Sequence, residues 1–357
     1  MKKKLLLLFV CISFLHLNAQ LTDVVTSGLV DPFDVVIEGD EAYIVEFQGS
    51  TISRIDITDD NPTLENVVTG IANPTTLLFD ANDVYIAQVN GLITRRDATD
   101  LVSNQTTIAS GLITPVSLVR NGDFLYFSEF QGGRIGRIDL ANGNAVETVI
   151  SGLNFPEQIA LIDDQLYITI SGSGAIGRIP IGVPNPQLEV IVTGLNTPAG
   201  IVASGDRLFV TEFVPDGDIF TINTAATTPT ATALVTGLSS PFGISVGNDA
   251  LFVVQNGNDR LSRYDGNLLS LTDETSTSIG FNVYPNPNAG EFRFTDIGNT
   301  IVLETEIYDL AGKRVAQITQ ETPIIENTLV QLNLQAGTYI AAIRTDQGTI
   351  QRKIVIR

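Results

Sequence analysis

Three glutamates recur at one spacing in the first 280 residues. Glu46, Glu129 and Glu212 are each followed by phenylalanine, and 83 residues separate each glutamate from the next. The first two belong to the motif EFQG. Carboxylate oxygens are good ligands for hard cations such as calcium, and they accept hydrogen bonds from hydroxyl groups. The three residues are therefore candidates for a site that binds a cation or a hydroxyl-rich ligand.

The elements that must position these glutamates follow from an internal repeat. The pattern Gly-(Leu/Ile)-x-x-Pro occurs six times, and its prolines are 41 to 43 residues apart, at Pro32, Pro74, Pro115, Pro156, Pro198 and Pro241. Each unit contains four short runs rich in Val, Ile, Tyr and Phe, separated by turn residues, which favours antiparallel strands over helices. A repeat of about 42 residues with four strands is typical of a β-propeller blade. The sequence predicts an all-β, six-bladed propeller.

Two positions in each predicted blade lie where propeller ligands usually bind, around the mouth of the central channel. The position two residues after the proline holds Asp34, Thr76, Ser117, Gln158, Gly200 and Gly243. The position fourteen residues after it holds Glu46, Gln88, Glu129, Ile170, Glu212 and Gln255. We take as candidate ligand-binding residues Asp34, Glu46, Gln88, Glu129, Gln158, Glu212 and Gln255.

A structural alternative competes with this interpretation for two of the glutamates. The third strand of most blades carries an arginine, and in a tight hairpin Arg54 would lie diagonal to Glu46 and Arg137 diagonal to Glu129 on the same face of the sheet. Such cross-strand pairs each contribute about 0.2–1 kcal/mol. We therefore expect these two glutamates to be paired with arginine.

Blade five has Thr221 in place of that arginine, so Glu212 lacks the obvious partner. The following loop, FVPDGDIF, adds Asp216 and Asp218. Three carboxylates so close in sequence are candidate ligands for calcium. The alternative is a solvated acidic turn.

Closure of the ring can also be read from the sequence. The last unit offers three strands but no clear fourth before the polar stretch 271–278, whereas TDVVTS at 22–27 resembles the fourth strands of other units. We expect this N-terminal segment to complete blade six, because a closed ring leaves fewer strand edges unpaired.

The first 19 residues have the features of a secretory signal peptide. Three lysines precede an apolar run too short to span a bilayer, and Ala19 offers a cleavage site. This segment contains the only Cys, His and Met of the chain, and the chain has no Trp. After cleavage the protein has no thiol or imidazole, which excludes Ser-His-Asp and Cys-His catalysis and His-ligated zinc or haem. Oxygen-ligated calcium is the cofactor that the composition allows.

The chain is acidic, with 40 Asp and Glu against 20 Lys and Arg and a formal net charge of −20. An acidic surface disfavours nucleic acid and anionic membranes as partners. No segment after the signal peptide resembles a membrane span. These observations fit an extracellular or outer-surface location.

The repeat resembles a known group of propellers. Its Gly-Leu-x-x-Pro, its LYVTE-like second strand and its Ile-x-Arg-Ile-Asp third strand resemble the NHL, YncE and gluconolactonase-like group, including the ScyD/ScyE-like set. That group contains enzymes, binding proteins and scaffolds, so the resemblance implies a fold more than a function. Gluconolactonase-like enzymes hold their metal starting from a glutamate just before Gly-Pro, and here GLVDPFD offers Asp31 and Asp34 instead.

A different pattern begins at residue 281. The segments YPNP, IYDLAGKRV and LQAGTYIAAI, with KIVIR near the end, resemble the type A C-terminal sorting domain of the Bacteroidetes type IX (Por) secretion system. About seven strand-like runs predict a small Ig-like β-sandwich. The resemblance implies export through Sec and the periplasm, with the type IX machinery as partner. The expected domains are a signal peptide (1–19), the propeller (20–272), a linker (273–280) and the sorting domain (281–357).

These observations favour a secreted or cell-surface, noncatalytic propeller that binds a ligand, such as a carbohydrate or a surface component, or acts as a scaffold. No catalytic residue is predicted, and no cofactor is required. The propeller lacks lysine, which removes imine chemistry. The alternative is a calcium-dependent lactonase or hydrolase of the gluconolactonase-like type, in which the metal would activate water.

Overall fold

The computed structural model describes residues 21–59, 61–102 and 105–265, followed by shorter stretches at 282–284, 290–295, 302–308, 314–318, 329–332, 334–335, 337–345 and 348–356. The chain forms two compact units, Met1–Leu268 and Leu269–Arg357. The predicted signal peptide and the linker at 273–280 lie outside the described residues. The domain boundaries at 272 and 281 stay predictions.

The first unit is a propeller of six four-stranded antiparallel sheets, as the repeat predicts. Each inner strand begins at the repeat proline: β2 (Pro32–Glu38), β6 (Pro74–Asp80), β10 (Pro115–Asn121), β14 (Pro156–Ile162), β18 (Pro198–Ser204) and β22 (Pro241–Gly247). The second strands are β3 (Glu41–Glu46), β7 (Asp83–Gln88), β11 (Phe124–Glu129), β15 (Gln165–Ile170), β19 (Arg207–Glu212) and β23 (Ala250–Gln255).

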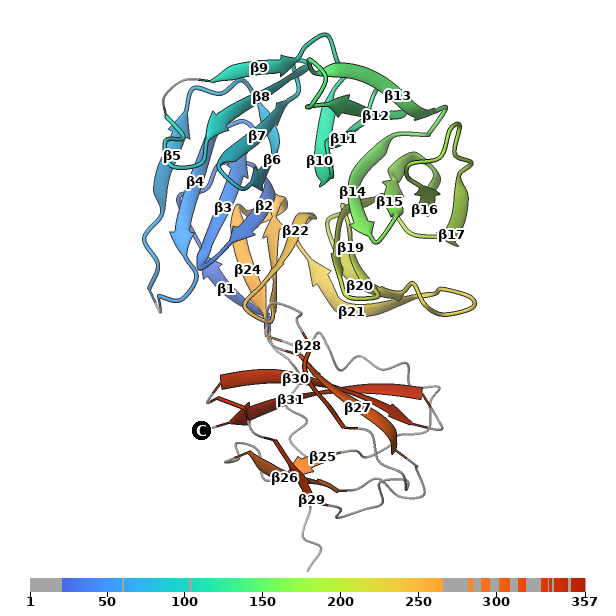
Figure 1. Ribbon diagram of the computed structural model, residues 1–357. Coiled ribbons are helices and arrows are strands. Elements are labelled where there is room, and N and C mark those ends of the chain that lie inside the picture. Colours follow the sequence, from blue (N-terminus) through green and yellow to red (C-terminus); the bar gives the residue numbers. More distant parts are fainter. Residues whose placement is uncertain are drawn as a thin grey trace, which may run out of the picture. The chain divides into compact units, whose positions relative to one another are not determined.

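The third strands are β4 (Thr51–Asp56), β8 (Leu92–Asp97), β12 (Arg134–Asp139), β16 (Ala175–Pro180), β20 (Gly217–Asn223) and β24 (Arg260–Tyr264). The outer strands are β5 (Glu65–Thr69), β9 (Thr106–Ala109), β13 (Ala145–Ser151), β17 (Glu189–Thr193), β21 (Ala231–Leu238) and β1 (Leu21–Val25). The inner strands lie nearest the centre of the ring, and the outer strands form its rim (Figure 1). Two single-turn 3-10 helices, η1 (Ser171–Ser173) and η2 (Asn256–Asn258), follow the second strands of blades four and six.

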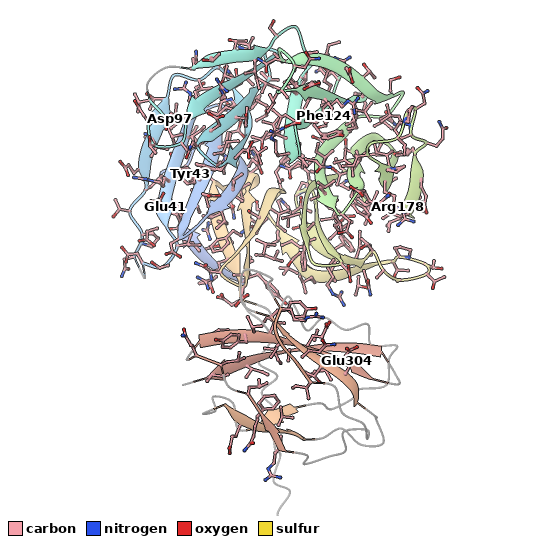
Figure 2. The ribbon with its side chains drawn as sticks, viewed as in Figure 1. Glu41, Tyr43, Asp97, Phe124, Arg178 and Glu304 are labelled. Atoms are coloured by element: carbon pink, nitrogen blue, oxygen red, sulfur yellow. The ribbon has the colours of Figure 1, made fainter. Side chains whose placement is uncertain are left out.

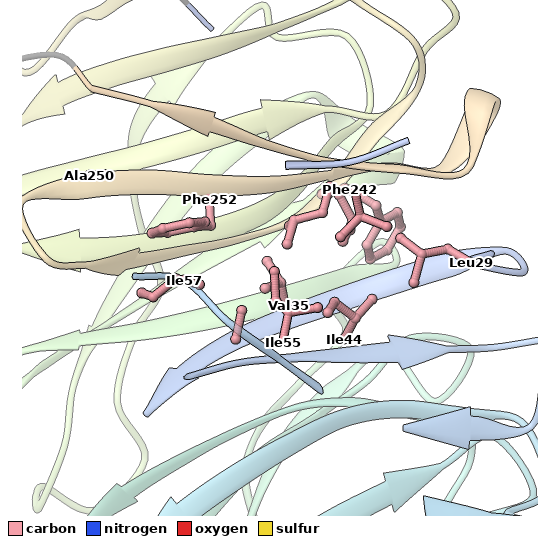
Figure 3. Close-up of a cluster of buried hydrophobic side chains, with 13 residues drawn as sticks. Leu29, Val35, Ile44, Ile55, Ile57, Phe242, Ala250 and Phe252 are labelled. Carbon is pink, nitrogen blue, oxygen red and sulfur yellow. The ribbon is translucent and has the colours of Figure 1, made fainter. Parts of the chain in front are cut away.

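The N-terminal strand closes the ring, which confirms the prediction from the sequence. β1 pairs with β24, the third strand of blade six, with Leu21 opposite Tyr264 and Val25 opposite Leu261. The neighbouring core, shown in Figure 3, joins side chains from blade six, such as Phe252, to side chains from blade one, such as Ile44. Both are fully buried. Burying one such side chain stabilises the fold by roughly 1.5–3 kcal/mol, so the first and last blades are held together largely by apolar packing.

All six inner strands begin with an irregularity in their pairing. The register with the second strand shifts directly after the proline in every blade. An irregularity of this kind re-aims the side chains beside it. The residues one and two positions after each proline are therefore displaced from the regular alternation of the strand.

The second unit contains two sheets in the stretches that the structure describes. One has the order β25 (Asn282–Tyr284), β26 (Glu291–Thr295) and β29 (Leu329–Gln331). The other has the order β28 (Arg314–Ile318), β27 (Val302–Tyr308), β30 (Gly337–Thr345) and β31 (Gly348–Ile356). Phe292 and Val330 of the first sheet share a buried cluster with Ile307 and Ile354 of the second, so the two sheets pack on one core. The Ig-like topology stays a prediction.

Within the described residues, no helix has the length and apolar character that crossing a membrane requires.

Candidate ligand-binding site

The position fourteen residues after the repeat proline is the same structural position in every blade. The pairing places Pro32 opposite Glu46, Pro115 opposite Glu129 and Pro198 opposite Glu212. The other three blades have the same register, with Gln88, Ile170 and Gln255 opposite their prolines. The interval of 83 residues is therefore two blades, as the sequence predicts.

Three of the five polar side chains at this position bind their own blade's backbone. Glu46 Oε2 accepts the Val30 N–H at 2.7 Å, and Glu212 Oε1 accepts the Asn196 N–H at 2.6 Å. Gln255 Oε1 accepts the N–H of Ser239 at 2.9 Å. Each donor lies two residues before the blade's proline. The side chain thus fastens the Gly-Leu-x-x-Pro loop to the end of the second strand.

The predicted pairs Glu46–Arg54 and Glu129–Arg137 are wrong. Arg54 lies opposite Tyr43, and Tyr43 is three residues from Glu46. Because strand side chains alternate between faces, an odd separation places Glu46 and Arg54 on opposite faces of the sheet. The same register holds in blade three, where Arg137 lies opposite Tyr126.

The repeated arginines form ion pairs away from the strand-end glutamates. Arg54 contacts Glu41 and Glu65, whereas Arg137 contacts Glu147. Arg178, labelled in Figure 2, contacts Glu189 on the outer strand at 2.8 Å. These glutamates are more than one third exposed, so water screens each pair and its contribution to stability is small.

Glu129 does have an arginine partner, but it is Arg134. The carboxylate accepts hydrogen bonds from Arg134 Nε and Nη2, both at 2.7 Å. Arg134 lies directly opposite Glu129 on β12, so the two side chains share a face. The Glu129 side chain is 1 % exposed, which makes this a buried bidentate ion pair. Losing Arg134 would leave the buried Glu129 carboxylate uncompensated and cost about 3–5 kcal/mol.

Glu212 is not the unpartnered carboxylate that the sequence suggests, because it holds the Asn196 N–H. Asp218 Oδ1 accepts the Gly237 N–H at 3.1 Å. Across the described residues, no three Asp, Glu, His or Cys side chains are grouped as a metal site would require. The structure thus does not bring Glu212, Asp216 and Asp218 together as one site.

The position two residues after the proline lies at the propeller axis and is buried. Asp34, Thr76, Ser117 and Gln158 are each no more than 5 % exposed. Gln158 Nε2 donates to Asp34 Oδ1 at 2.9 Å, although the two residues are 124 positions apart and belong to opposite blades. Gln158 Oε1 accepts the N–H of Ile201 from the next blade at 3.2 Å. The side chains of opposite blades therefore meet across the axis.

Burial raises the pKa of Asp34 from 3.8 to about 6, although hydrogen bonds with Thr76, Gln158 and the Val35 backbone act in the opposite direction. Gly243 makes room for this carboxyl group, because a Cβ atom there would lie 2.3 Å from Asp34 Oδ1. Blade six therefore needs a glycine at this axial position, because a larger residue would collide with the Asp34 side chain.

Hydroxyl groups on the second strands connect neighbouring blades around the axis. Thr169 Oγ1 donates to Ala199 O at 2.7 Å, and Thr211 Oγ1 donates to Phe242 O at 2.6 Å. Ser128 Oγ makes the equivalent bond to Glu157 O. The polar groups near the axis are thus largely engaged with one another. They hold the blades together.

The position fifteen residues after the proline was not predicted from the sequence as part of the site. Its six members, which we call the mouth ring, are all partly exposed: Phe47, Val89, Phe130, Ser171, Phe213 and Asn256. Phe47 stacks on Phe33 with the ring centroids 5.5 Å apart, and Phe213 meets Phe242 edge-on at 5.0 Å. The signal was present in the sequence, since phenylalanine follows all three recurring glutamates.

Glu157 was also missed. It lies directly after the proline of blade four and is 7 % exposed. Burial raises its pKa from 4.5 to about 8, and a hydrogen bond with the Ser171 side chain acts in the opposite direction. A buried carboxyl group beside a partly exposed ring is a candidate functional residue. The sequence did contain a sign of this residue, because the position directly after the proline is Phe, Thr, Val or Ala in the other five blades and acidic only in blade four.

Comparison with known proteins identifies the C-terminal segment. Residues 282–357 match the secretion system C-terminal sorting domain, also called the Por secretion tail. A search of curated proteins found no match to the chain. The segment expected from the sequence to be a sorting domain is confirmed.

Solved structures share the propeller fold. A luciferin-regenerating enzyme has a TM-score of 0.58 at 12% identity, with 69% of this chain and 95% of that chain covered. An auxiliary nutrient binding protein from Bacteroides ovatus has a TM-score of 0.55 at 12% identity, covering 69% and 72%. Regucalcin from Agrobacterium tumefaciens, described as a calcium-binding protein, has a TM-score of 0.51 at 12% identity, covering 68% and 92%. These similarities confirm the fold, and their different functions carry no activity over to this chain.

Proposed function

We propose that this protein is an exported, noncatalytic β-propeller that binds a ligand at the mouth ring, outside the cell or on its outer surface. The sorting domain at 282–357 supports secretion. The observation that carries the binding proposal is the mouth ring itself, in which four of the six partly exposed side chains are apolar, namely Phe47, Val89, Phe130 and Phe213.

Partly exposed apolar side chains that gather at one place mark binding surfaces more often than they mark plain surface. Phe33 and Phe242 add further aromatic contacts to the ring, with centroids 4.0 Å apart. Covering such side chains with a ligand contributes roughly 25 cal/mol per Å² of apolar area removed from water. Most of the carboxylates described above are already engaged, since Glu46 and Glu212 hold backbone N–H groups, Glu129 holds Arg134 and Asp34 holds Gln158, which favours binding over catalysis.

The test is ligand-observed NMR with a panel of oligosaccharides, aromatic acids and apolar amines. Phe213→Ala should weaken a bound compound by about tenfold, because one aromatic contact is lost. The control is Val146→Ala, which removes an apolar side chain that is 42% exposed on the outer strand β13. If a compound binds equally well to the Phe213→Ala and Val146→Ala variants, its binding site does not include Phe213 of the mouth ring.

A calcium-dependent lactonase is the competing proposal, and the fold shared with regucalcin is the observation that favours it. Its closest candidate ligands are Asp31 and Asp34. The Asp31 carboxylate accepts from Asn256 Nδ2, and Asp34 is bound to Gln158. Lactone hydrolysis that requires calcium and disappears in Asp34→Asn would favour the hydrolase, whereas we expect no calcium-dependent turnover.

A further inference from the structure

The residues directly after the repeat prolines form an inner layer at the mouth ring. They are Phe33, Thr75, Val116, Glu157, Ala199 and Phe242. Glu157 is the one ionisable side chain among these six. In blade one, Phe33 at this position stacks on Phe47 of the mouth ring. In blade four the equivalent pair is Glu157 and Ser171, joined by a hydrogen bond between their side chains. A polar pair therefore takes the place of an aromatic pair.

An exposed pair of phenylalanines flanks this polar pair. Phe130 of the mouth ring stacks on Phe155 with the ring centroids 4.9 Å apart, and Phe155 is 46% exposed. The N–H and Oγ of Ser171 both donate to Phe155 O at 3.0 Å. Ser171 thus connects the carboxyl group of Glu157 to the aromatic pair.

The internal repeat indicates that Phe130 and Glu157 are neighbours, because the equivalent residues of another pair of blades are in contact. Phe213 of the mouth ring in blade five contacts Phe242 of blade six, directly after that blade's proline. Phe130 and Glu157 hold the equivalent positions in blades three and four. By the repeat, the residue that corresponds to Phe242 beside Phe130 is therefore a carboxylic acid, Glu157.

Glu157 is buried and has no ion-pair partner among the residues that the structure describes. The pKa of Glu157 is raised mainly by burial, and the other influence on it is the Ser171 hydrogen bond. The charged groups nearby have partners of their own, since Glu129 on the adjacent β11 is paired with Arg134, and Asp34 of the opposite blade holds Gln158. A carboxyl group in this setting keeps its proton near neutral pH, and an incoming cation would stabilise the ionised form.

We propose that the sector formed by Phe130, Phe155, Glu157 and Ser171 binds the ammonium group of an amine ligand with an apolar body. This inference rests on the proposed function of the mouth ring. Glu157 is the counter-ion, and the phenylalanine rings contact the apolar body and the cation. One carboxylate and one hydroxyl supply too few oxygen ligands for calcium, which takes six to eight. The aromatic neighbours fit an organic cation better than a metal ion.

Binding has a defined proton balance. The ligand keeps its ammonium proton, and Glu157 releases its carboxyl proton to the solvent as the ion pair forms. At pH 7, below the Glu157 pKa of about 8, close to one proton should therefore leave the protein for each amine bound. Amine binding should also tighten as the pH rises from 6 to 8.

The experiment compares 2-phenylethylammonium with 2-phenylethanol, which has the same apolar body and no charge. Isothermal titration calorimetry of the purified protein at pH 7, in two buffers with different ionisation enthalpies, measures affinity and proton release together. We expect the amine to bind about tenfold or more tightly than the alcohol, with proton release for the amine alone.

Three variants make the assignment specific. Glu157→Gln should abolish the preference for the amine and the proton release, and Ser171→Ala should weaken amine binding several-fold. The matched control is Glu189→Gln on β17 of the same blade, whose carboxylate pairs with Arg178 and lies outside the mouth ring. This variant should bind both probes as the unchanged protein does.

The inference is overturned if the two probes bind equally, if neither binds, or if the amine preference survives Glu157→Gln. The variant Phe155→Ala shows whether such a result contradicts only the amine assignment or also the proposed binding site at the mouth ring. If both probes bind equally and Phe155→Ala weakens both, the mouth ring is a binding site and the amine assignment alone is wrong.

Discussion

Glu46, Glu212 and Gln255 each accept the backbone N–H two residues before their blade's proline. In the EFQG motif at 46–49, the glutamate therefore holds the loop, and the phenylalanine belongs to the mouth ring. The glycine allows close approach, since a Cβ atom on Gly132 would lie 2.3 Å from Glu129 Oε2. Loop fastening thus explains two of the three recurring glutamates, Glu46 and Glu212, whereas Glu129 pairs with Arg134.

Glu212 tests this explanation, because it was the candidate calcium ligand. Glu212→Ala removes the acceptor for the Asn196 N–H and should lower the free energy of unfolding by about 1–2 kcal/mol. Glu212→Gln keeps an acceptor oxygen and should restore most of that loss. Urea unfolding of both variants, with and without calcium, measures the effect. A calcium-dependent stabilisation that is lost in Glu212→Gln would restore the metal interpretation.

Asp34 makes stability depend on pH. Its pKa is raised from 3.8 in the unfolded chain to about 6 in the fold, so the folded state binds the proton more tightly. The resulting stabilisation is fully present below pH 3.8 and is lost as the pH rises through 6, with a total of about 3 kcal/mol.

Asp34→Asn should remove this part of the pH dependence. As the pH rises from 4 to 7, the free energy of unfolding of the unchanged protein should fall relative to that of the variant. Urea unfolding at each pH measures both free energies. The exposed Asp164→Asn, in the turn between β14 and β15, is the control and should follow the unchanged protein. If the unfolding free energies of Asp34→Asn and of the unchanged protein change with pH in parallel, the raised pKa of Asp34 is wrong.

At the scale of elements, the ring depends on a strand from the other end of the propeller sequence. β1 carries Asp23, which contacts Arg260 and accepts a hydrogen bond from Ser262 at 2.7 Å. Val25 of the same strand belongs to the core shown in Figure 3. Without β1, the third strand of blade six would present unpaired backbone groups to solvent, which promotes association with other chains.

A protein that begins at residue 28 should therefore melt at a clearly lower temperature and aggregate. A protein that begins at Leu21 keeps the whole of β1 and is the control. Adding a synthetic peptide of residues 21–27 should recover part of the lost melting temperature, because the peptide can pair with β24. Calorimetry and size-exclusion chromatography measure both effects. An unchanged melting temperature after removal of β1 would contradict its role in closure.

At the scale of the whole molecule, two units have separate cores. The propeller is closed on itself, and the second unit packs its two sheets on the cluster around Phe292 and Ile307. The match of residues 282–357 to the sorting domain assigns the second unit a task in export. Each unit can therefore be changed without removing the core of the other.

Deletion of residues 282–357 should leave the propeller folded and stop its delivery. The melting transition of the purified propeller should persist, while cell fractionation should show that the protein is retained in the periplasm. The complementary control fuses residues 282–357 to an unrelated secreted protein, which should then be exported. Normal export of the deleted form would show that the propeller carries its own signal.

The sequence was enough to predict the periodic features of the protein. The spacing of six prolines predicted six blades, and the resemblance of residues 22–27 to other outer strands predicted ring closure. These features follow from local pattern, because strands, turns and repeats are written in neighbouring residues. The sorting domain was recognisable for the same reason.

Which side chains meet was decided by the tertiary structure. The four residues between Glu46 and Thr51 set the register that places Arg54 on the opposite face, and a one-residue difference reverses every such contact. Asp34 and Gln158 meet across the axis only because ring closure brings opposite blades together. The burial that raises the pKa of Glu157 likewise arises from packing between blades and not from its sequence neighbours. The sequence by itself determined the fold and the export domain, whereas the candidate site depends on distances between blades that no local pattern encodes.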